Sequence, residues 1–363
     1  MPQTGDIAVV GAGIVGLATA HALKEAGESV VVYERGRPGG GQSAAESRLF
    51  RHAHDDRRLA ELTRESRAVW REWEERFGTE LISRDGVVAL GDDAIEKLRI
   101  LDELGGVDAR EIEPDEVAER LPILAEQPRP AVFDADGGAI RTSAAIEALS
   151  AELGDAIRPG ELISARATGP ETVEVRTESE RAEHSRLVVC AGRGAPALAR
   201  TVGLSLPVTH GAHVRVTFAL AGEPPERLAC LQDSSGAFPE TGVYAAPLPG
   251  NGAFAVGLSE TTDAKEDGTL PDPGELEGLG ERTVAYVERA LPGLEPRPIG
   301  HLHCFVTELP WSEDAFAVWE AGPILFVAGH NLFKQAPGLG RLVARAARGE
   351  GLDERLRPGA RLG

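Results

Sequence analysis

The chain has 363 residues, with 58 acidic and 38 basic side chains and a formal net charge of −20. This length allows one large domain or two interleaved domains with a buried core. The negative charge repels phosphodiester backbones and anionic lipids, so we expect neither nucleic acid nor a membrane as a partner. The alternative is that the charge serves only solubility.

The sequence shows little sign of a membrane-spanning segment or of a disulfide scaffold. No apolar run reaches the roughly 18 residues of a spanning helix, and no basic segment precedes an apolar one at the start. We therefore expect a cytoplasmic protein. As a separate expectation, the protein is a monomer or a weak homodimer. Cys190, Cys230 and Cys304 are too few and too scattered for a disulfide scaffold.

The first elements are expected to be a strand, a glycine turn, a helix and a second strand. Gly11, Gly13 and Gly16 form a G-x-G-x-x-G pattern, and Glu34 ends "SVVVYE" 18 residues after Gly16. In this arrangement the glycines allow a tight turn and close approach of a pyrophosphate, the helix N-terminus faces the anion, and the carboxylate binds a ribose hydroxyl. An adenine dinucleotide is expected; the alternative is a glycine-rich turn in an unrelated α/β protein.

The pattern does not distinguish FAD from NAD. A glycine-rich loop, "GRPGGGQSAAESRLFRHAH", follows where a simple NAD-binding fold would continue into its next helix and strand. This insertion favours a long cofactor that lies across the domain, as FAD does.

The middle of the chain alternates between helical and strand patterns. Residues 57–78 have the spacing of an amphipathic helix, residues 80–140 read as short strands around the helical segment "PDEVAERLP", and residues 142–154 are again helical. "SRLVVCAGRG" is a buried strand that runs into a glycine turn. Residues 207–260 alternate as an antiparallel sheet, in which "GNGAFA" is a hairpin turn.

The last part of the chain contains "HLHCFVTELP" and then a buried strand, a glycine-rich loop and a helix that we expect to begin near Gly338. The period of a strand places His301 and His303 on one face and Cys304 on the other, which disfavours a shared metal. An ordinary strand and a cofactor attachment site remain as alternatives.

These features together resemble a known family. "VVGAGIVG", Glu34, "SRLFRHAH", "LVVCAG", the Cys-x-x-Thr strand and "GHNLFKQAPGLG" are similar to the D-amino acid oxidase superfamily, in particular to the monomeric sarcosine oxidase and N-methyltryptophan oxidase group. The resemblance runs through nearly the whole chain. It implies an α/β (mixed α+β) fold with two interleaved domains. A Rossmann-like FAD-binding domain of glutathione-reductase type would comprise residues 1–79, 142–206 and 305–363, and a substrate domain with a mostly antiparallel mixed sheet would comprise residues 80–141 and 207–304.

The resemblance also implies FAD as the cofactor. In the resembling group, a cysteine at the position of Cys304 forms a thioether to the flavin, so a covalent FAD is expected here; the rival expectation is an inert cysteine with noncovalent FAD. The implied FAD-binding residues are Gly11, Gly13, Ile14, Val15, Gly16, Glu34, Arg35, Gln42, Ser43, Arg48, Ala191, Gly192, Cys304, Gly329, Asn331, Leu332, Phe333 and Lys334.

Charged residues are expected to hold the substrate. By resemblance, Arg51 and Lys334 bind a carboxylate, Arg48 lies near the flavin, and Lys265 assists the reaction with oxygen. Lysine occurs only four times in the chain, which makes its presence in the C-terminal loop informative. The alternative is that these side chains form surface ion pairs.

The amine pocket departs from the family pattern. Where the group has tyrosines, this chain has His54, Val306, and Phe254 or Ala255, and we expect His54 and Phe254 to contact the substrate. The resemblance implies oxidation of a C–N bond in a small carboxylate-bearing amine, imino acid or amino acid, with O2 reduced to H2O2. The alternatives are a dehydrogenase of the same fold, a flavin monooxygenase, and a binding module that keeps FAD structurally.

Overall fold

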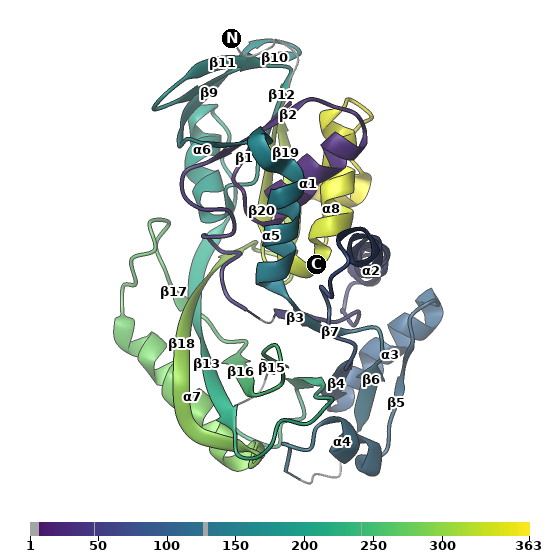
Figure 1. Ribbon diagram of the computed structural model, residues 1–363. Helices are drawn as coiled ribbons and strands as arrows, with labels where there is room; N and C mark the ends of the chain where they lie inside the picture. The colour runs from purple at the N-terminus through teal and green to yellow at the C-terminus, as the bar shows by residue number, and fades with distance from the viewer. Residues whose placement is uncertain (1–6, 47, 126–129, 241) are drawn as a thin grey trace. The chain divides into compact units, whose positions relative to one another are not determined.

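The computed structural model describes residues 7–46, 48–125, 130–240 and 242–363 (Figure 1). The chain divides into two compact units. Unit 1 comprises Met1–Ala44, Ser143–His210 and Val306–Gly363, and unit 2 comprises Ala45–Thr142 and Gly211–Phe305. Residues 45–79, which we placed with the FAD-binding part on sequence grounds, therefore belong to unit 2. The roles of the units as FAD-binding and substrate domains stay predictions.

Unit 1 is built on a six-stranded sheet with mainly parallel strands (Figure 1). β1 lies in the middle and pairs in parallel with β2 and β12 because its four residues are apolar and buried on both faces. The strand order is β19 (Phe316–Ala321), β20 (Ile324–Gly329), β12 (Arg186–Val189), β1 (Ile7–Val10), β2 (Val30–Glu34) and β8 (Ile157–Pro159). Only β19 runs antiparallel to its neighbour.

The helices α1 (Ile14–Glu25) and α8 (Leu332–Ala347) pack against one another in unit 1. A Cβ atom on Gly340 would lie 2.7 Å from the Ala18 carbonyl carbon, so the glycine allows the two backbones to approach closely.

The remaining elements of this unit are α5 (Thr142–Leu153, of which Thr142 belongs to unit 2), α6 (Ala195–Thr201), a three-stranded sheet of β9 (Leu162–Gly169), β10 (Thr172–Thr177) and β11 (Arg181–His184), and the 3-10 turns Gly154–Ala156, Gly192–Gly194, Glu354–Leu356 and Pro358–Ala360.

The expected start of the last helix was wrong. α8 begins at Leu332, after Asn331 in the left-handed region, and Gly338 lies inside the helix. Pro337 lies inside the helix, within its second turn. The first turn of α8 therefore consists of Leu332, Phe333 and their neighbours, directly after β20.

Unit 2 is built on a nine-stranded, mostly antiparallel sheet (Figure 1). The pair β14–β4 is parallel, so the sheet is mixed, and the expected fold class is confirmed. The strand order is β17 (Thr262–Asp263), β13 (Thr209–Leu220), β16 (Ala253–Leu258), β15 (Val243–Pro247), β14 (Cys230–Asp233), β4 (Val87–Leu90), β6 (Ala131–Asp134) and β5 (Ala109–Glu111), and β18 (Leu294–Glu308) pairs with β13.

One face of this sheet forms the hydrophobic core of unit 2. Val214 and Val216 of β13, Val243 of β15 and Val256 of β16 point to it, together with the apolar residues of α7 (Pro273–Ala290). The residues between them point to the opposite face, because side chains alternate along a strand. We call this opposite face, with His213, Arg215, Tyr244 and Gly257, the polar face.

The other elements of unit 2 are α2 (Arg57–Phe77), α3 (Asp92–Leu104), α4 (Pro114–Arg120) and a two-stranded sheet of β3 (Arg48–Phe50) and β7 (Gly138–Ile140). The amphipathic pattern of α2 was recognised in the sequence, and its bounds agree within one residue. α3 and α7 were missed: the region of α3 was read as short strands, and residues 273–290 were assigned to no element.

Candidate active site

The glycine turn between β1 and α1 has the shape that the G-x-G-x-x-G pattern requires. Gly11 has a φ of +97°, and a Cβ atom there would lie 2.5 Å from the Cys190 carbonyl oxygen. A Cβ atom on Gly16 would collide with the Gly11 carbonyl oxygen. Gly13 is the N-cap of α1, where Ile14 and Val15 begin the helix. Close contacts within the turn thus require glycine at positions 11 and 16, and the N-terminus of α1, the part of the pattern that faces a pyrophosphate, follows directly.

Glu34 and Ser43 bind the backbone of this turn. Glu34 accepts hydrogen bonds from the Ala12 N–H (2.7 Å) and the Gly36 N–H (2.8 Å). Ser43 Oγ accepts from the Ile14 N–H at 3.0 Å. A carboxylate has about four acceptor sites, so Glu34 retains capacity for a ribose hydroxyl.

The other predicted FAD residues of unit 1 lie on loops that follow strands. Gln42 donates a hydrogen bond to Thr307 Oγ1 at 3.2 Å. Its side-chain oxygen lies so close to Gly192, the residue after Ala191, that a Cβ atom on Gly192 would collide with it. Arg35 is exposed and forms a surface ion pair with Glu161 at 3.4 Å. The fit of Arg35 to a buried cofactor contact is therefore poor, whereas Gln42 is held in place.

The C-terminal loop and the start of α8 bring five predicted residues together within six residues of chain. Gly329 ends β20 at a φ of +148°, and Asn331 caps α8 and binds Asp314. Leu332, Phe333 and Lys334 form the first turn of α8. Lys334 is only 5% exposed. A cation in the first turn of a helix is opposed by the helix dipole, so this position favours a role with an anion.

In unit 2, Arg51 and His54 lie on the segment that follows β3. The Arg51 guanidinium donates to the Ala53 carbonyl oxygen and lies 3.5 Å from His54 Nδ1. His54 is buried, with 2% of its surface exposed. The structure therefore brings these two predicted substrate residues together.

The buried pair of His52 and Asp134 anchors the same segment. Asp134 accepts from the His52 N–H at 2.9 Å, and His52 Nδ1 lies 3.0 Å from each of the two Asp134 oxygens. Burial acts to raise the pKa of Asp134, but the interactions with His52 outweigh it and hold this pKa below its ordinary value. Sequence patterns gave no signal for this pair, because its members are 82 residues apart.

Arg48 lies in a cluster of polar side chains that includes Cys304, Arg215 and Tyr244. Desolvation lowers the pKa of Arg48, Cys304 and Tyr244 oppose this shift, and Arg215 adds to it. Arg215 is 5% exposed and donates to the Glu46 carbonyl oxygen at 3.2 Å. The predicted flavin residues Arg48 and Cys304 are therefore neighbours within unit 2.

Arg215, Tyr244 and His213 are candidate site residues that the sequence reasoning missed. Arg215 and Tyr244 both pair with Gly257, one from each side. A Cβ atom on Gly257 would lie 2.5 Å from Tyr244 Oη, so the tyrosine ring lies over this glycine. The strand alternation of "AHVRVTF" and "GVYAAP" was a usable signal, since it separates these polar residues from the core residues.

Phe254 and Lys265 do not lie where the sequence placed them. Phe254 has no exposed surface and belongs to the hydrophobic core of unit 2, because its side chain points away from the polar face. Lys265 lies on an exposed turn after β17, where its N–H donates to Thr269. The expected substrate contact of Phe254 and oxygen contact of Lys265 find no support in these positions.

His301 and His303 are exposed on β18, and Cys304 is half-buried. Among the residues that the structure describes, no three His, Cys, Asp or Glu side chains are grouped in a way that could hold a metal ion. Cys190 lies at the end of β12, where burial raises its pKa to about 12 and keeps the thiol neutral.

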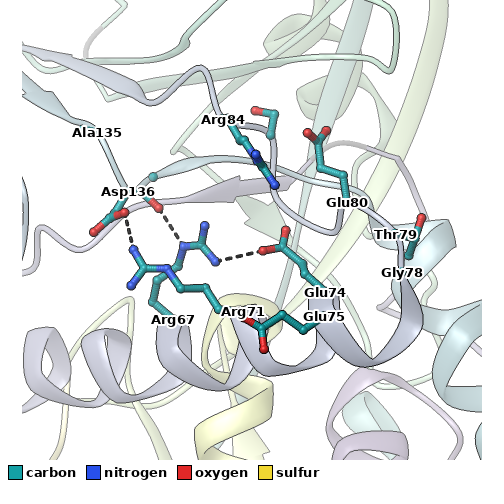
Figure 2. Close-up of a pocket in the computed structure, with 12 residues that line it drawn as sticks. Arg67, Arg71, Glu74, Glu75, Gly78, Thr79, Glu80, Arg84, Ala135 and Asp136 are labelled. Atoms are coloured by element: carbon teal, nitrogen blue, oxygen red, sulfur yellow. Dashed lines mark hydrogen bonds and ion pairs between the residues drawn. The ribbon is translucent and has the colours of Figure 1, made fainter.

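A surface pocket of about 630 Å³ lies at the C-terminal half of α2 in unit 2 (Figure 2). Arg67 donates to the Asp136 carbonyl oxygen at 2.9 Å and lies 3.5 Å from Glu74, and Arg71 pairs with Asp136. Glu74 also accepts from the N–H groups of Leu81 and Ile82. These charged groups join α2 to the following chain, and none of the predicted site residues lines the pocket.

No helix in the described part of the chain is both long enough and apolar enough to cross a membrane. The location in the cytoplasm stays a prediction.

Comparison with known proteins agrees with the geometry of the glycine turn. The family model of DAO, FAD dependent oxidoreductase, matches residues 6–346. The human protein "Peroxisomal sarcosine oxidase" is 28% identical over 213 residues, which is 56% of this chain and 54% of that protein. The aligned part thus spans about half the length of this curated relative.

Solved structures share the fold at low identity. NikD, an amino acid oxidase of nikkomycin biosynthesis, has a TM-score of 0.83 at 21% identity, with 98% of both chains covered. Glycine oxidase from Geobacillus kaustophilus has a TM-score of 0.77 at 20% identity, with 99% of this chain and 98% of that chain covered. L-proline dehydrogenase from P. horikoshii has a TM-score of 0.79 at 18% identity, with 98% and 96% covered.

The family match covers more than nine tenths of the chain, and the glycine turn with Glu34 fits the adenine dinucleotide that such a family binds. The chain belongs to the DAO family of FAD-dependent oxidoreductases.

Proposed function

We propose that the protein oxidises the C–N bond of a small carboxylate-bearing secondary amine, imino acid or amino acid to an imine, with O2 as the electron acceptor and H2O2 as the second product. The buried position of Lys334 carries this proposal. Lys334 lies in the first turn of α8, the end of the C-terminal loop that the resemblance places at the substrate, and its ammonium offers a point charge to an anionic substrate group.

Arg51 is the second proposed carboxylate ligand. A guanidinium presents a planar set of donors that fits two carboxylate oxygens, and a lysine adds a point charge. The His52–Asp134 pair holds the backbone beside Arg51, which keeps the guanidinium in place.

FAD, when bound, would supply the acceptor for a hydride from the substrate carbon. The glycine turn, Glu34, Gln42 and the first turn of α8 are the proposed binding elements for FAD in unit 1. Arg48 and Cys304 are the proposed FAD contacts in unit 2. The proposed covalent bond through Cys304 is tested below.

The role of Lys334 is tested by Lys334→Met, which removes the charge and keeps the length of the side chain. Loss of one partner from a buried charged contact costs about 2 kcal/mol or more, so KM should rise at least about 30-fold while the protein stays folded and yellow. Steady-state kinetics measures this effect. Lys24→Met, at an exposed lysine of α1, is the matched control and should leave KM unchanged; an unchanged KM in Lys334→Met would refute the proposed role.

A dehydrogenase of the same fold is the second candidate. The position of Lys265 on an exposed turn favours it, because the resemblance assigned the oxygen reaction to a lysine, and the other three lysines lie on α1, α3 and α8. Oxygen uptake with any amine that reduces the flavin supports the oxidase. Rapid turnover with an artificial quinone but not with O2 supports the dehydrogenase.

A further inference from the structure

The pocket at the C-terminal half of α2 is lined by two buried polar side chains (Figure 2). Arg67 is 8% exposed and Ser83 is 2% exposed, and the pocket volume of about 630 Å³ is typical of a small-molecule site. We propose that this pocket binds an oxyanion, namely the phosphate or carboxylate group of a small metabolite. None of the proposed substrate residues Arg51, His54 and Lys334 lines it.

Arg67 retains hydrogen-bond donors for a ligand. A guanidinium has five N–H groups. The Nε–H of Arg67 donates to the Asp136 carbonyl oxygen at 2.9 Å, and Nη1 lies 3.5 Å from a Glu74 oxygen, which is long for a hydrogen bond. Among the residues that the structure describes, the Nη2 hydrogens of Arg67 have no acceptor, so they remain for a ligand in the pocket.

Ser83 and Arg84 add donors from the segment that precedes β4. Ser83 Oγ accepts from the Ala139 N–H at 3.0 Å, and its hydroxyl hydrogen has no acceptor in the described part of the chain. The Arg84 side chain is exposed and forms no hydrogen bond or ion pair with any described residue. Figure 2 shows that it points toward the Arg67–Glu74 pair, from the opposite side of the pocket.

Most carboxylates of the pocket already have partners of their own. Glu74 accepts from two backbone N–H groups, at 2.9 and 3.0 Å. Asp136 pairs with Arg71. Glu80 pairs with Arg141 at 3.3 Å. The groups that remain for a ligand are therefore mainly donors, and a negatively charged group with several acceptor oxygens fits them best.

The charges of the pocket favour the same class of ligand. Desolvation lowers the pKa of Arg67, and the interactions with Glu74 and Asp136 reverse this shift only in part. The nearby carboxylates therefore do not offset the whole cost of burying this guanidinium. Arg84 brings a second positive charge, and Glu75, the remaining carboxylate, is exposed and points away from it in Figure 2. An anion between the two guanidiniums stabilises both charges.

The test is calorimetric titration of the holoenzyme with sodium phosphate and, separately, with sodium acetate, at constant ionic strength. Arg84→Gln removes one positive charge from the pocket. We expect it to weaken binding of the better-bound anion at least about 10-fold, the size expected for one hydrogen bond to a charged group. Arg84→Glu reverses the charge and should abolish this binding. Because Arg84 is exposed, both variants should fold, which their melting temperatures check.

Arg99→Gln, at an exposed arginine of α3 that does not line the pocket, is the matched control and should keep the wild-type affinity. The proposed substrate residues can also bind acetate, so the result is the change that each variant causes. Binding of phosphate tighter than that of acetate, or the reverse, supports the inference and identifies the ligand as a phosphate compound or a carboxylate. The inference is overturned if neither anion binds, if both Arg84 variants keep the wild-type affinity, or if Arg99→Gln loses as much affinity as Arg84→Gln.

Discussion

At the scale of single residues, the buried pair of His52 and Asp134 has the clearest energetic consequence. The pair fixes the segment that carries Arg51, and the pKa of Asp134 is lowered because the interactions with His52 outweigh the effect of burial. The carboxylate accepts a hydrogen bond from the His52 N–H and lies against the His52 ring, and the loss of such bonds to a buried charged group costs about 3 kcal/mol.

Asp134→Asn should therefore lower the free energy of unfolding by about 3 kcal/mol at neutral pH, measured by urea denaturation. Because the folded pKa lies below the unfolded pKa, the stabilisation is complete above the ordinary Asp value and is lost as the pH falls through the folded value. The difference between wild type and variant should shrink in acid. Asp55→Asn, at a side chain that is 84% exposed, is the control and should change the free energy by at most about 0.5 kcal/mol; a constant difference at all pH values would contradict this account.

Cys304 decides whether the flavin is covalently bound. Only an accessible cysteine can attack the flavin ring, and Cys304 is partly exposed and interacts with Arg48. After acid precipitation we expect the wild-type pellet to be yellow and the Cys304→Ala pellet to be colourless, with the colour in the supernatant. Cys230→Ala is the control and should behave as the wild type. A colourless wild-type pellet would show that FAD is noncovalent.

Site residues could be predicted from the sequence where the residues that form a site are close together in the chain. The glycine turn and Glu34 lie within 24 residues of one another, and their spacing alone defines their geometry. Phe254 was assigned to the substrate because the choice between it and Ala255 depends on the phase of one strand, and a one-residue error moves a side chain to the other face. Tyr244 and His213 lie close together only because their strands belong to the same sheet, so no local sequence pattern predicts their contact.

At the scale of elements, the contact between α1 and α8 depends on Gly340. A methyl group there would lie 2.7 Å from the Ala18 carbonyl carbon, which is closer than backbone atoms tolerate. The helices would have to move apart, and α8 carries Lys334 in its first turn.

Gly340→Ala should lower the free energy of unfolding by about 2 kcal/mol, the usual size for an overpacked contact, and should weaken FAD binding. Gly278→Ala in α7 is the matched control, because a Cβ atom at this helical glycine meets no atom within 4 Å. Alanine has the higher helix propensity, so this variant should be more stable by about 0.5–1 kcal/mol. Both values can be measured by urea denaturation; equal effects at the two sites would exclude steric contact as the cause.

The elements most easily predicted were those with a single strong periodicity. β1 is a short run of buried apolar residues, and α2 has a wide apolar stripe with charges opposite. α7 was missed because Gly274, Gly278 and Gly280 and the N-terminal Pro273 disguise its pattern. Its amphipathic character becomes visible only when Leu276, Leu279 and Val287 are seen in the core of unit 2.

At the scale of the whole molecule, each unit consists of separate chain segments joined through the other unit. If unit 2 unfolded alone, the segments of unit 1 would be linked by two flexible loops of roughly 100 residues each. Closing a loop of that length costs about 5 kcal/mol in the chain-entropy model. Unit 1 alone would therefore be much less stable, and the same argument applies to unit 2.

We expect both units to unfold in one transition. Pulsed hydrogen exchange with mass spectrometry at increasing urea concentration should give the same midpoint for peptides from β1 and from β16, which lie in different units. Two clearly separated midpoints would show that the units are independently stable. The sequence analysis placed residues 45–79 with the first segment of the chain, whereas the structure puts them in unit 2, because strand pairing rather than composition decides this placement.

The bare backbone at position 257 has a consequence for enzyme engineering. Gly257 carries only a hydrogen atom next to the Tyr244 ring. An added methyl group would displace this ring and enlarge the space on the polar face of the sheet. Substitutions at this one codon offer a direct way to change the space next to Arg48 and Arg215 while both arginines are retained.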